Sequence, residues 1–72
     1  MTLEEAEEKI RIGKKYQHYK GKIYTVSFIA FDKETEKPVV VYYDKAGNYF
    51  TRPADMWLEN INMPRFKLLK EE

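Results

Sequence analysis

His18 is the single histidine of the chain, and its ordinary pKa lies close to neutral pH. It is therefore the one obvious candidate for a general base. A catalytic imidazole needs a group that orients it and a nucleophile or metal beside it. The sequence has no Gly-x-Ser-x-Gly motif and no phosphate-binding loop. The structural alternative for His18 is a hydrogen bond that anchors a turn at Lys20 and Gly21.

The residue types also exclude several kinds of site. The chain has no cysteine, which removes thiolate chemistry, disulfides and cysteine-rich zinc sites. One histidine rules out a histidine-pair metal motif, and no spacing of acidic residues matches an EF-hand loop. We expect no catalytic residue, no metal and no cofactor. The sequence therefore favours a binding or structural role over an enzyme.

Two arginines and a group of rings could contact a ligand. Arg52 and Arg65 lie beside prolines and near aromatic residues in the sequence. A guanidinium group can bind phosphate or carboxylate through two hydrogen bonds. The structural alternative is an ion pair with Asp55 or Glu59, or stacking on a ring. Trp57 could form a ligand platform with the rings around the predicted hairpin, which are Tyr42, Tyr43, Tyr49 and Phe50.

Such a platform has two candidate ligands. Rings near a one-turn helix commonly grip proline-rich peptides in SH3-like barrels, whereas rings mixed with cations stack the bases of nucleic acid. Most rings are also needed to fill so small an interior, and we expect Trp57 and Phe50 to be mainly core. We expect the surplus rings to form one contiguous exposed area. The predicted ligand-binding residues are His18, Tyr42, Arg52, Trp57 and Arg65.

Composition limits the domain count and the partners. The chain has 72 residues, 43% hydrophobic, 35% charged and 15% aromatic, which is typical of one globular domain. A domain of this size buries about 60% of its unfolded surface, so large rings offset the small interior. The net charge of +1 indicates no partner by itself. Residues 9–31 carry no acid, and this stretch is either a basic face for phosphates or a solvated surface balanced by the preceding glutamates.

Hydrophobic patterns predict a short N-terminal helix followed by strands. Thr2 and Glu5 form a capping-box pattern at the start of the helix. A single helical turn at 53–58 precedes the last strand. Apolar residues on both faces of 23–31 indicate either a bulge or two partly covered faces. The five strands are expected at 15–19, 23–31, 39–43, 49–52 and 65–69.

These elements favour a mainly β fold, an SH3-like small barrel with an added N-terminal helix, because a closed or half-closed barrel removes exposed sheet edges. An OB-like barrel is the nearest alternative, but that fold usually carries its longer helix between the third and fourth strands. We expect one domain, 1–72, with a helical extension at 1–12 and the barrel at 13–70. No apolar run approaches the about 20 residues that span a bilayer, and the acidic start is unlike a secretory signal. A cytoplasmic location is therefore expected.

Short motifs along the chain resemble a known group of short bacterial domains of unknown function. They begin with Gly13-Lys14-Lys15-Tyr16-Gln17-His18-Tyr19-Lys20-Gly21, continue through Val40-Val41-Tyr42 and Arg52-Pro53-Ala54-Asp55-Met56-Trp57, and end with Pro64-Arg65-Phe66. The acidic helix lies outside the pattern, and Phe28 and Phe31 occur where smaller or polar residues are expected. The resemblance implies a compact, mainly β domain and brings no established activity.

The leading hypothesis is a non-catalytic binding module that recognises a peptide or nucleic-acid segment through an aromatic and basic face. Rings would stack on the ligand, arginines would contact its anionic groups and His18 would donate a hydrogen bond. The alternative is a homodimer in which Phe28, Phe31 and the stripe of Leu3 and Ala6 pack against a second copy. A small enzyme is the third hypothesis, which requires a carboxylate within hydrogen-bonding distance of His18.

Overall fold

Helix α1 (Leu3–Lys9) begins where the sequence predicts it, in a computed structural model that describes residues 1–69. The Thr2 hydroxyl accepts a hydrogen bond from the Glu5 backbone N–H, and the Glu5 carboxylate accepts one from the Thr2 N–H. The helix ends at Lys9 because the next residue, Ile10, is already extended. Ala6 and Ile10 are fully buried, so α1 contributes directly to the core.

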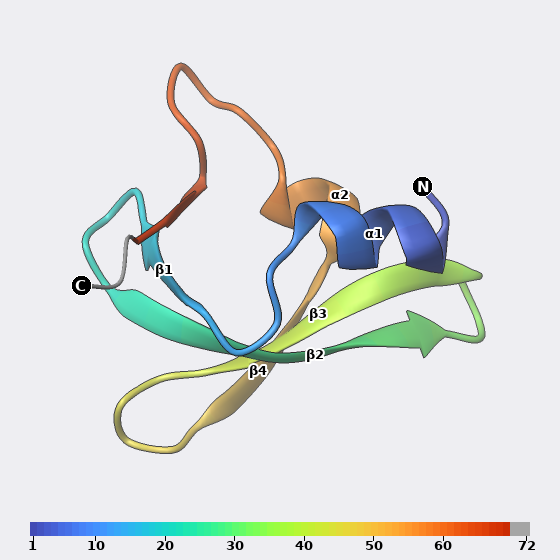
Figure 1. Ribbon diagram of the computed structural model, residues 1–72, viewed down its shortest axis with the longest axis horizontal. Coiled ribbons are helices and arrows are strands. Elements are labelled where there is room, and N and C mark those ends of the chain that lie inside the picture. The colour runs from blue at the N-terminus through green and yellow to red at the C-terminus, as the bar shows by residue number, and fades with distance from the viewer. Residues whose placement is uncertain (70–72) are drawn as a thin grey trace.

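Five antiparallel strands follow, in the order β4-β3-β2-β1-β5 across one sheet (Figure 1). A second short helix, α2 (Ala54–Trp57), lies between the last two strands in the chain, unlike the arrangement of an OB-like barrel. The mainly β class, the five strands and the two helices are confirmed. The predicted domain end at residue 70 lies outside the described residues. The strands are β1 (Lys15–His18), β2 (Ile23–Asp32), β3 (Lys37–Tyr43), β4 (Tyr49–Pro53) and β5 (Phe66–Leu68).

Two turns have the residues that their backbone requires. Gly21, in the β1–β2 turn, has a φ of 108°, and Gly47, in the β3–β4 hairpin, has a φ of 84°. Glycine adopts these positive values without steric cost. In the hairpin, the Asp44 carboxylate accepts hydrogen bonds from the backbone N–H groups of Ala46 and Asn48. The hairpin therefore fixes the register between β3 and β4.

Strand β2 contains a bulge, one of the two alternatives that its apolar residues indicated. Its register against β3 shifts between Val26 and Phe28. After the shift, Ile29 packs against the core and Phe28 is left about half exposed. Both helices lie on one face of the sheet (Figure 1). This face, which carries the buried Tyr16 and Tyr42, is termed the inner face, and the face that carries Phe28 is termed the outer face.

Rings fill much of the core beneath the helices. Trp57 of α2 is 1% exposed and stacks on Phe66 of β5, with ring centres 3.7 Å apart and planes 5° from parallel. Tyr16 and Tyr42 contact the same indole edge-on, at 5.3 and 4.9 Å between ring centres. Trp57 therefore joins α2 to three strands, β1, β3 and β5, on the inner face. The smaller core residues are Ala6, Ile10, Val26, Val40 and Ala54.

The sheet is open, so it does not form the closed version of the barrel that the sequence analysis predicted as closed or half-closed. Strands β4 and β5 are its two edges and do not pair with each other within residues 1–69. Pro53 ends β4 and precedes α2, and residues 58–65 then carry the chain across the gap before β5 begins. Side chains bridge this gap instead of backbone hydrogen bonds. The guanidinium carbon of Arg52 lies 5.3 Å from the ring centre of Phe66.

Replacing Trp57 by alanine should destabilise the domain severely, because the variant loses the ring that joins α2 to Phe66 and keeps a cavity in its place. We expect the free energy of unfolding to fall by about 3–5 kcal/mol. Urea denaturation followed by circular dichroism measures this change. The control is Met63→Ala, at a half-exposed side chain, which should change the free energy by less than about 0.5 kcal/mol. Equal losses in both variants would contradict the role assigned to Trp57.

Candidate ligand-binding site

Three of the five predicted site residues come together at the gap between β4 and β5. His18 ends β1, Arg52 lies in β4 and Arg65 immediately precedes β5. The positive charges of Arg52 and Arg65 both act on the imidazole of His18, which places the three side chains in one electrostatic environment. These residues, together with the adjoining Tyr19 and Lys20, are termed the cationic site.

The other two predicted residues, Tyr42 and Trp57, lie in the core. Tyr42 is 5% exposed and Trp57 is 1% exposed, so neither ring has a free face for a ligand. The ligand-stacking role predicted for them is incompatible with this burial. Both residues instead pack on the core side of the site and help to position its side chains. Tyr42 Oη accepts a long hydrogen bond of 3.4 Å from Arg52 Nε, and Trp57 stacks on Phe66, the ring that Arg52 covers.

Arg52 is positioned by a ring and a hydroxyl group. Its guanidinium lies over Phe66, which confirms the ring-stacking interpretation. Its hydrogen bond to Tyr42 is at the long end of the normal range and is therefore weak. No ion pair joins Arg52 to a carboxylate within the described part of the chain, residues 1–69. Its charge is thus not neutralised by a protein partner there.

Arg65 forms the ion pair that the sequence analysis considered. Its Nη2 donates to Glu59 Oε1 at 2.6 Å. The Glu59 side chain is 43% exposed, and pairs at such positions contribute about 0–1 kcal/mol. The guanidinium carbon also lies 5.9 Å from the ring centre of Tyr19, while the Tyr19 N–H donates to the Arg65 carbonyl. Because a guanidinium has five N–H donors, Arg65 can contact an anion in addition to Glu59.

His18 anchors the β1–β2 turn. Its Nδ1 accepts a hydrogen bond of 3.2 Å from the Lys20 backbone N–H, which confirms the structural interpretation of this residue. The imidazole packs edge-on against Phe66, with ring centres 4.9 Å apart, and against Tyr19 at 4.4 Å. The ring is therefore held between the core and the surface.

Burial and nearby charge make His18 a weaker base than usual. Partial burial lowers its pKa from the ordinary value of 6.5, and the positive charges of Arg52, Arg65 and Lys20 lower the pKa further. The imidazole is accordingly mainly neutral at neutral pH. An anion that screened these charges would raise the pKa again.

The exposed rings do not form the single contiguous area that we predicted. Tyr19 and Phe50 are 41% and 39% exposed, so the expectation that Phe50 is mainly core is wrong. Tyr49 and Phe28 lie on the outer face, and Phe31 lies near the end of β2. The rings are therefore divided between two faces. A line of ring contacts on the inner face does connect Tyr19, His18, Phe66, Tyr42 and Phe50.

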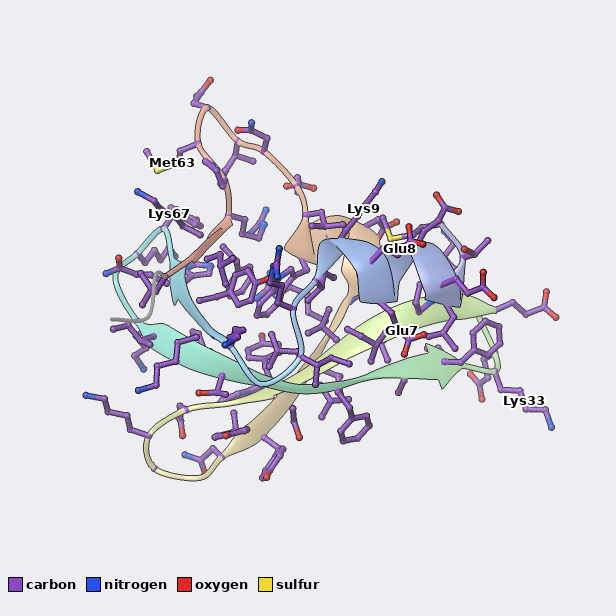
Figure 2. All side chains as sticks on the ribbon, in the orientation of Figure 1. Glu7, Glu8, Lys9, Lys33, Met63 and Lys67 are labelled. Carbon is purple, nitrogen blue, oxygen red and sulfur yellow. The ribbon has the colours of Figure 1, made fainter. Side chains whose placement is uncertain are left out.

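A groove of about 420 Å³ adjoins the cationic site. The β1–β2 turn forms one wall, and the segment that leads into β5 forms the other. Figure 2 shows Met63 and Lys67 together at this end of the molecule, while Lys33 lies at the opposite end. A ligand held at the cationic site thus has room to extend along the surface. The lining residues are Gln17, His18, Tyr19, Gly21, Met63, Pro64 and Lys67.

The fold and this site define a small antiparallel β domain with a cationic and aromatic surface at its sheet gap. Residues 14–68 match the family described as a protein of unknown function (DUF1653), and the chain belongs to this family. The match includes β1 to β5 and all five predicted site residues, and it leaves α1 outside. Comparisons with curated proteins and with solved structures gave no match. Within residues 1–69, the two helices are too short to cross a membrane.

Arg52→Gln should raise the pKa of His18, because the substitution removes a positive charge that disfavours the imidazolium form. Proton NMR measures this pKa without ambiguity, since the chain has one histidine. Lys33→Gln removes the same charge at the opposite end of the molecule and should leave the pKa unchanged (Figure 2). An unchanged or lower pKa in Arg52→Gln would show that Arg52 does not act on His18.

Proposed function

We propose that this domain is a non-catalytic module that binds a single-stranded nucleic-acid segment at the cationic site. The main support is Arg52, held over Phe66 with no carboxylate partner within residues 1–69. Beside it, Tyr19 is 41% exposed, with Lys20 Nζ 5.8 Å and the Arg65 guanidinium 5.9 Å from its ring centre. Single-stranded nucleic acid supplies both phosphates for cations and bases for an exposed ring.

The burial of Trp57 argues against a proline-rich peptide as the ligand. We infer an SH3-like arrangement from the strand order and from the position of α2 between β4 and β5. In such folds, rings near the one-turn helix line the peptide groove. Here the ring on α2 is Trp57, which is 1% exposed and stacked on Phe66. The exposed ring beside the cations is Tyr19, which favours an anionic ligand with stacking bases.

The alternatives have weaker support. The Nδ1 of His18 is engaged with the Lys20 backbone, as expected of a residue that shapes a turn rather than one that catalyses a reaction. A homodimer would need a shared apolar patch, but Phe28 and Phe31 lie an odd number of residues apart in β2 and face opposite sides. Ala6 is fully buried in the core of its own chain. A bacterial, cytoplasmic setting stays a prediction from the sequence.

Tyr19→Leu and Arg52→Gln test the proposed ligand. The first should weaken binding of a labelled oligothymidylate of about 8 nucleotides by about 1–3 kcal/mol, the typical contribution of one stacked base. The second should reduce the dependence of log K on log salt by about 0.7, the value for one phosphate contact in single strands. Fluorescence anisotropy at several salt concentrations measures both quantities.

Lys33→Gln is the charge-matched control, because it lies at the opposite end of the molecule and should leave affinity and salt dependence unchanged (Figure 2). Thermal melts establish that the variants are folded. The proposal fails if the wild-type domain does not bind the oligonucleotide at low salt. It also fails if a proline-rich peptide binds and the oligonucleotide does not, which would favour the peptide hypothesis.

Binding should also strengthen at acidic pH. A phosphate near His18 offsets the charges of Arg52, Arg65 and Lys20, so the pKa of His18 should be higher in the complex than in the free domain. A site that gains protons on binding has an affinity that rises as pH falls through its pKa in the complex. The pKa of His18 is measured by NMR with and without oligonucleotide. His18→Gln should lose this pH dependence, and an unchanged pKa in the complex would place the phosphate elsewhere.

A further inference from the structure

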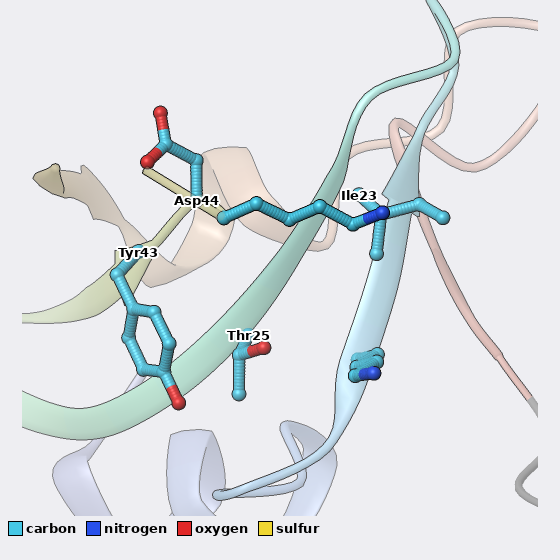
Figure 3. Close-up of a pocket in the computed structure, with 6 residues that line it drawn as sticks. Ile23, Thr25, Tyr43 and Asp44 are labelled. Carbon is cyan, nitrogen blue, oxygen red and sulfur yellow. The ribbon is translucent and has the colours of Figure 1, made fainter. Parts of the chain in front are cut away.

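The outer face also combines rings with cations. Cross-strand register places Lys15, Thr25, Tyr43 and Tyr49 in one row across β1, β2, β3 and β4. Tyr49 is 63% exposed, and its ring centre lies 5.3 Å from that of Tyr43. Figure 3 shows Thr25 and Tyr43 as neighbours on adjoining strands. This row lies on the other side of the sheet from the buried rings of the inner face.

Two adjoining hollows lie beside this row. The larger, of about 370 Å³, includes Lys15, Thr25, Tyr43 and Asp44 in its lining (Figure 3). The smaller, of about 290 Å³, lies closer to the β1–β2 turn. Both hollows are lined by Ile23 and Lys45, so they form one continuous depression, termed the outer groove.

The β1–β2 turn connects the outer groove with the cationic site. Gly21 lines the smaller hollow and also the groove beside His18 and Tyr19. Apart from its chain neighbours, no atom of residues 1–69 lies within 4 Å of the position that a Cβ atom of Gly21 would occupy, so these residues leave the surface at this point open. Lys22, the next residue, lines the outer groove. A continuous path therefore leads from Tyr19 across Gly21 to Lys22 and Lys45.

The charge along this path is mainly positive. Lys15, Lys22 and Lys45 are exposed, and none forms an ion pair with a carboxylate among the described residues 1–69. Among the described residues, 1–69, Asp44 is the one carboxylate that lines the outer groove. Its oxygens accept hydrogen bonds from the Ala46 and Asn48 N–H groups and from Asn48 Nδ2, so they are engaged within the hairpin.

We propose that the nucleic-acid strand held at the cationic site crosses the β1–β2 turn at Gly21 and continues along the outer groove. Lys22 and Lys45 contact its phosphates there, and a base stacks on the exposed ring of Tyr49. The inference rests on the proposed function above and extends it, because it assigns the domain a second contact surface. The charge of the outer groove matches a polyanion, and its tyrosine pair provides the stacking surface that single strands use. Affinity must then depend on strand length.

The double variant Lys22→Gln/Lys45→Gln tests this path with oligothymidylates of about 4 and about 16 nucleotides. Loss of two phosphate contacts should reduce the salt slope by about 1.4, which corresponds to a loss of about 25-fold in affinity at about 0.1 M salt. This loss is expected for the long strand, while the short strand should bind the variant as it binds the wild type. Tyr49→Ser should weaken binding of the long strand by at least about 5-fold, with no effect on the short strand.

Lys33→Gln/Lys37→Gln removes the same charge near the other end of the molecule and should affect neither strand. Circular dichroism melts show whether each variant is folded. If the wild type binds both strands and the outer-groove variants show no selective loss of affinity for the long strand, the proposed path is wrong. The proposed function is then left intact. Equal losses with the Lys33→Gln/Lys37→Gln control overturn it too, because they indicate an effect of net charge alone. If the wild type binds neither strand, the proposed function fails and the path fails with it.

Discussion

The stack between Trp57 and Phe66 is the contact on which the rest of the structure depends. The sheet is open, and β4 and β5 do not pair with each other within residues 1–69, so backbone hydrogen bonds do not hold its two edges together. Trp57, on the short helix that follows β4, spans the gap and packs flat against Phe66 of β5. Burial of two large rings removes on the order of 150–250 Å² each from water, which is a large contribution in a domain of this size.

The same contact links the core to the cationic site. Phe66 stacks on Trp57, while the Arg52 guanidinium and the His18 imidazole contact its ring at the gap. Among the described residues, 1–69, the site is therefore positioned by apolar packing rather than by ion pairs, with the Arg65–Glu59 pair as the exception. This has an electrostatic consequence. A guanidinium held by rings keeps its full charge for a ligand, whereas one held by a carboxylate must exchange partners.

Local signals in the sequence predicted the local structure well. The capping box at Thr2 and the bulge in β2, one of the two alternatives considered for that strand, depend on near neighbours in the chain. Which rings are buried depends on how strands and helices pack together. Strand alternation separates Tyr42 from Tyr43, but it does not show how far the helices cover the inner face. The sequence therefore did not predict that Phe50, expected in the core, is exposed at the gap while Tyr42 is buried.

The β1–β2 turn determines where the cations of the acid-free stretch, residues 9–31, lie in the structure. This turn folds the stretch around one end of the sheet, so that His18 and Lys20 lie at the cationic site while Lys15 and Lys22 line the outer groove. The glutamates that balance these charges lie on α1, a separate element. With a net charge of +1, attraction at long range is weak, and charges more than about 8–10 Å apart are largely screened in physiological salt. Recognition of an anionic strand, as proposed here, would therefore depend on the local arrangement of cations and rings around the turn, and not on the charge of the whole domain.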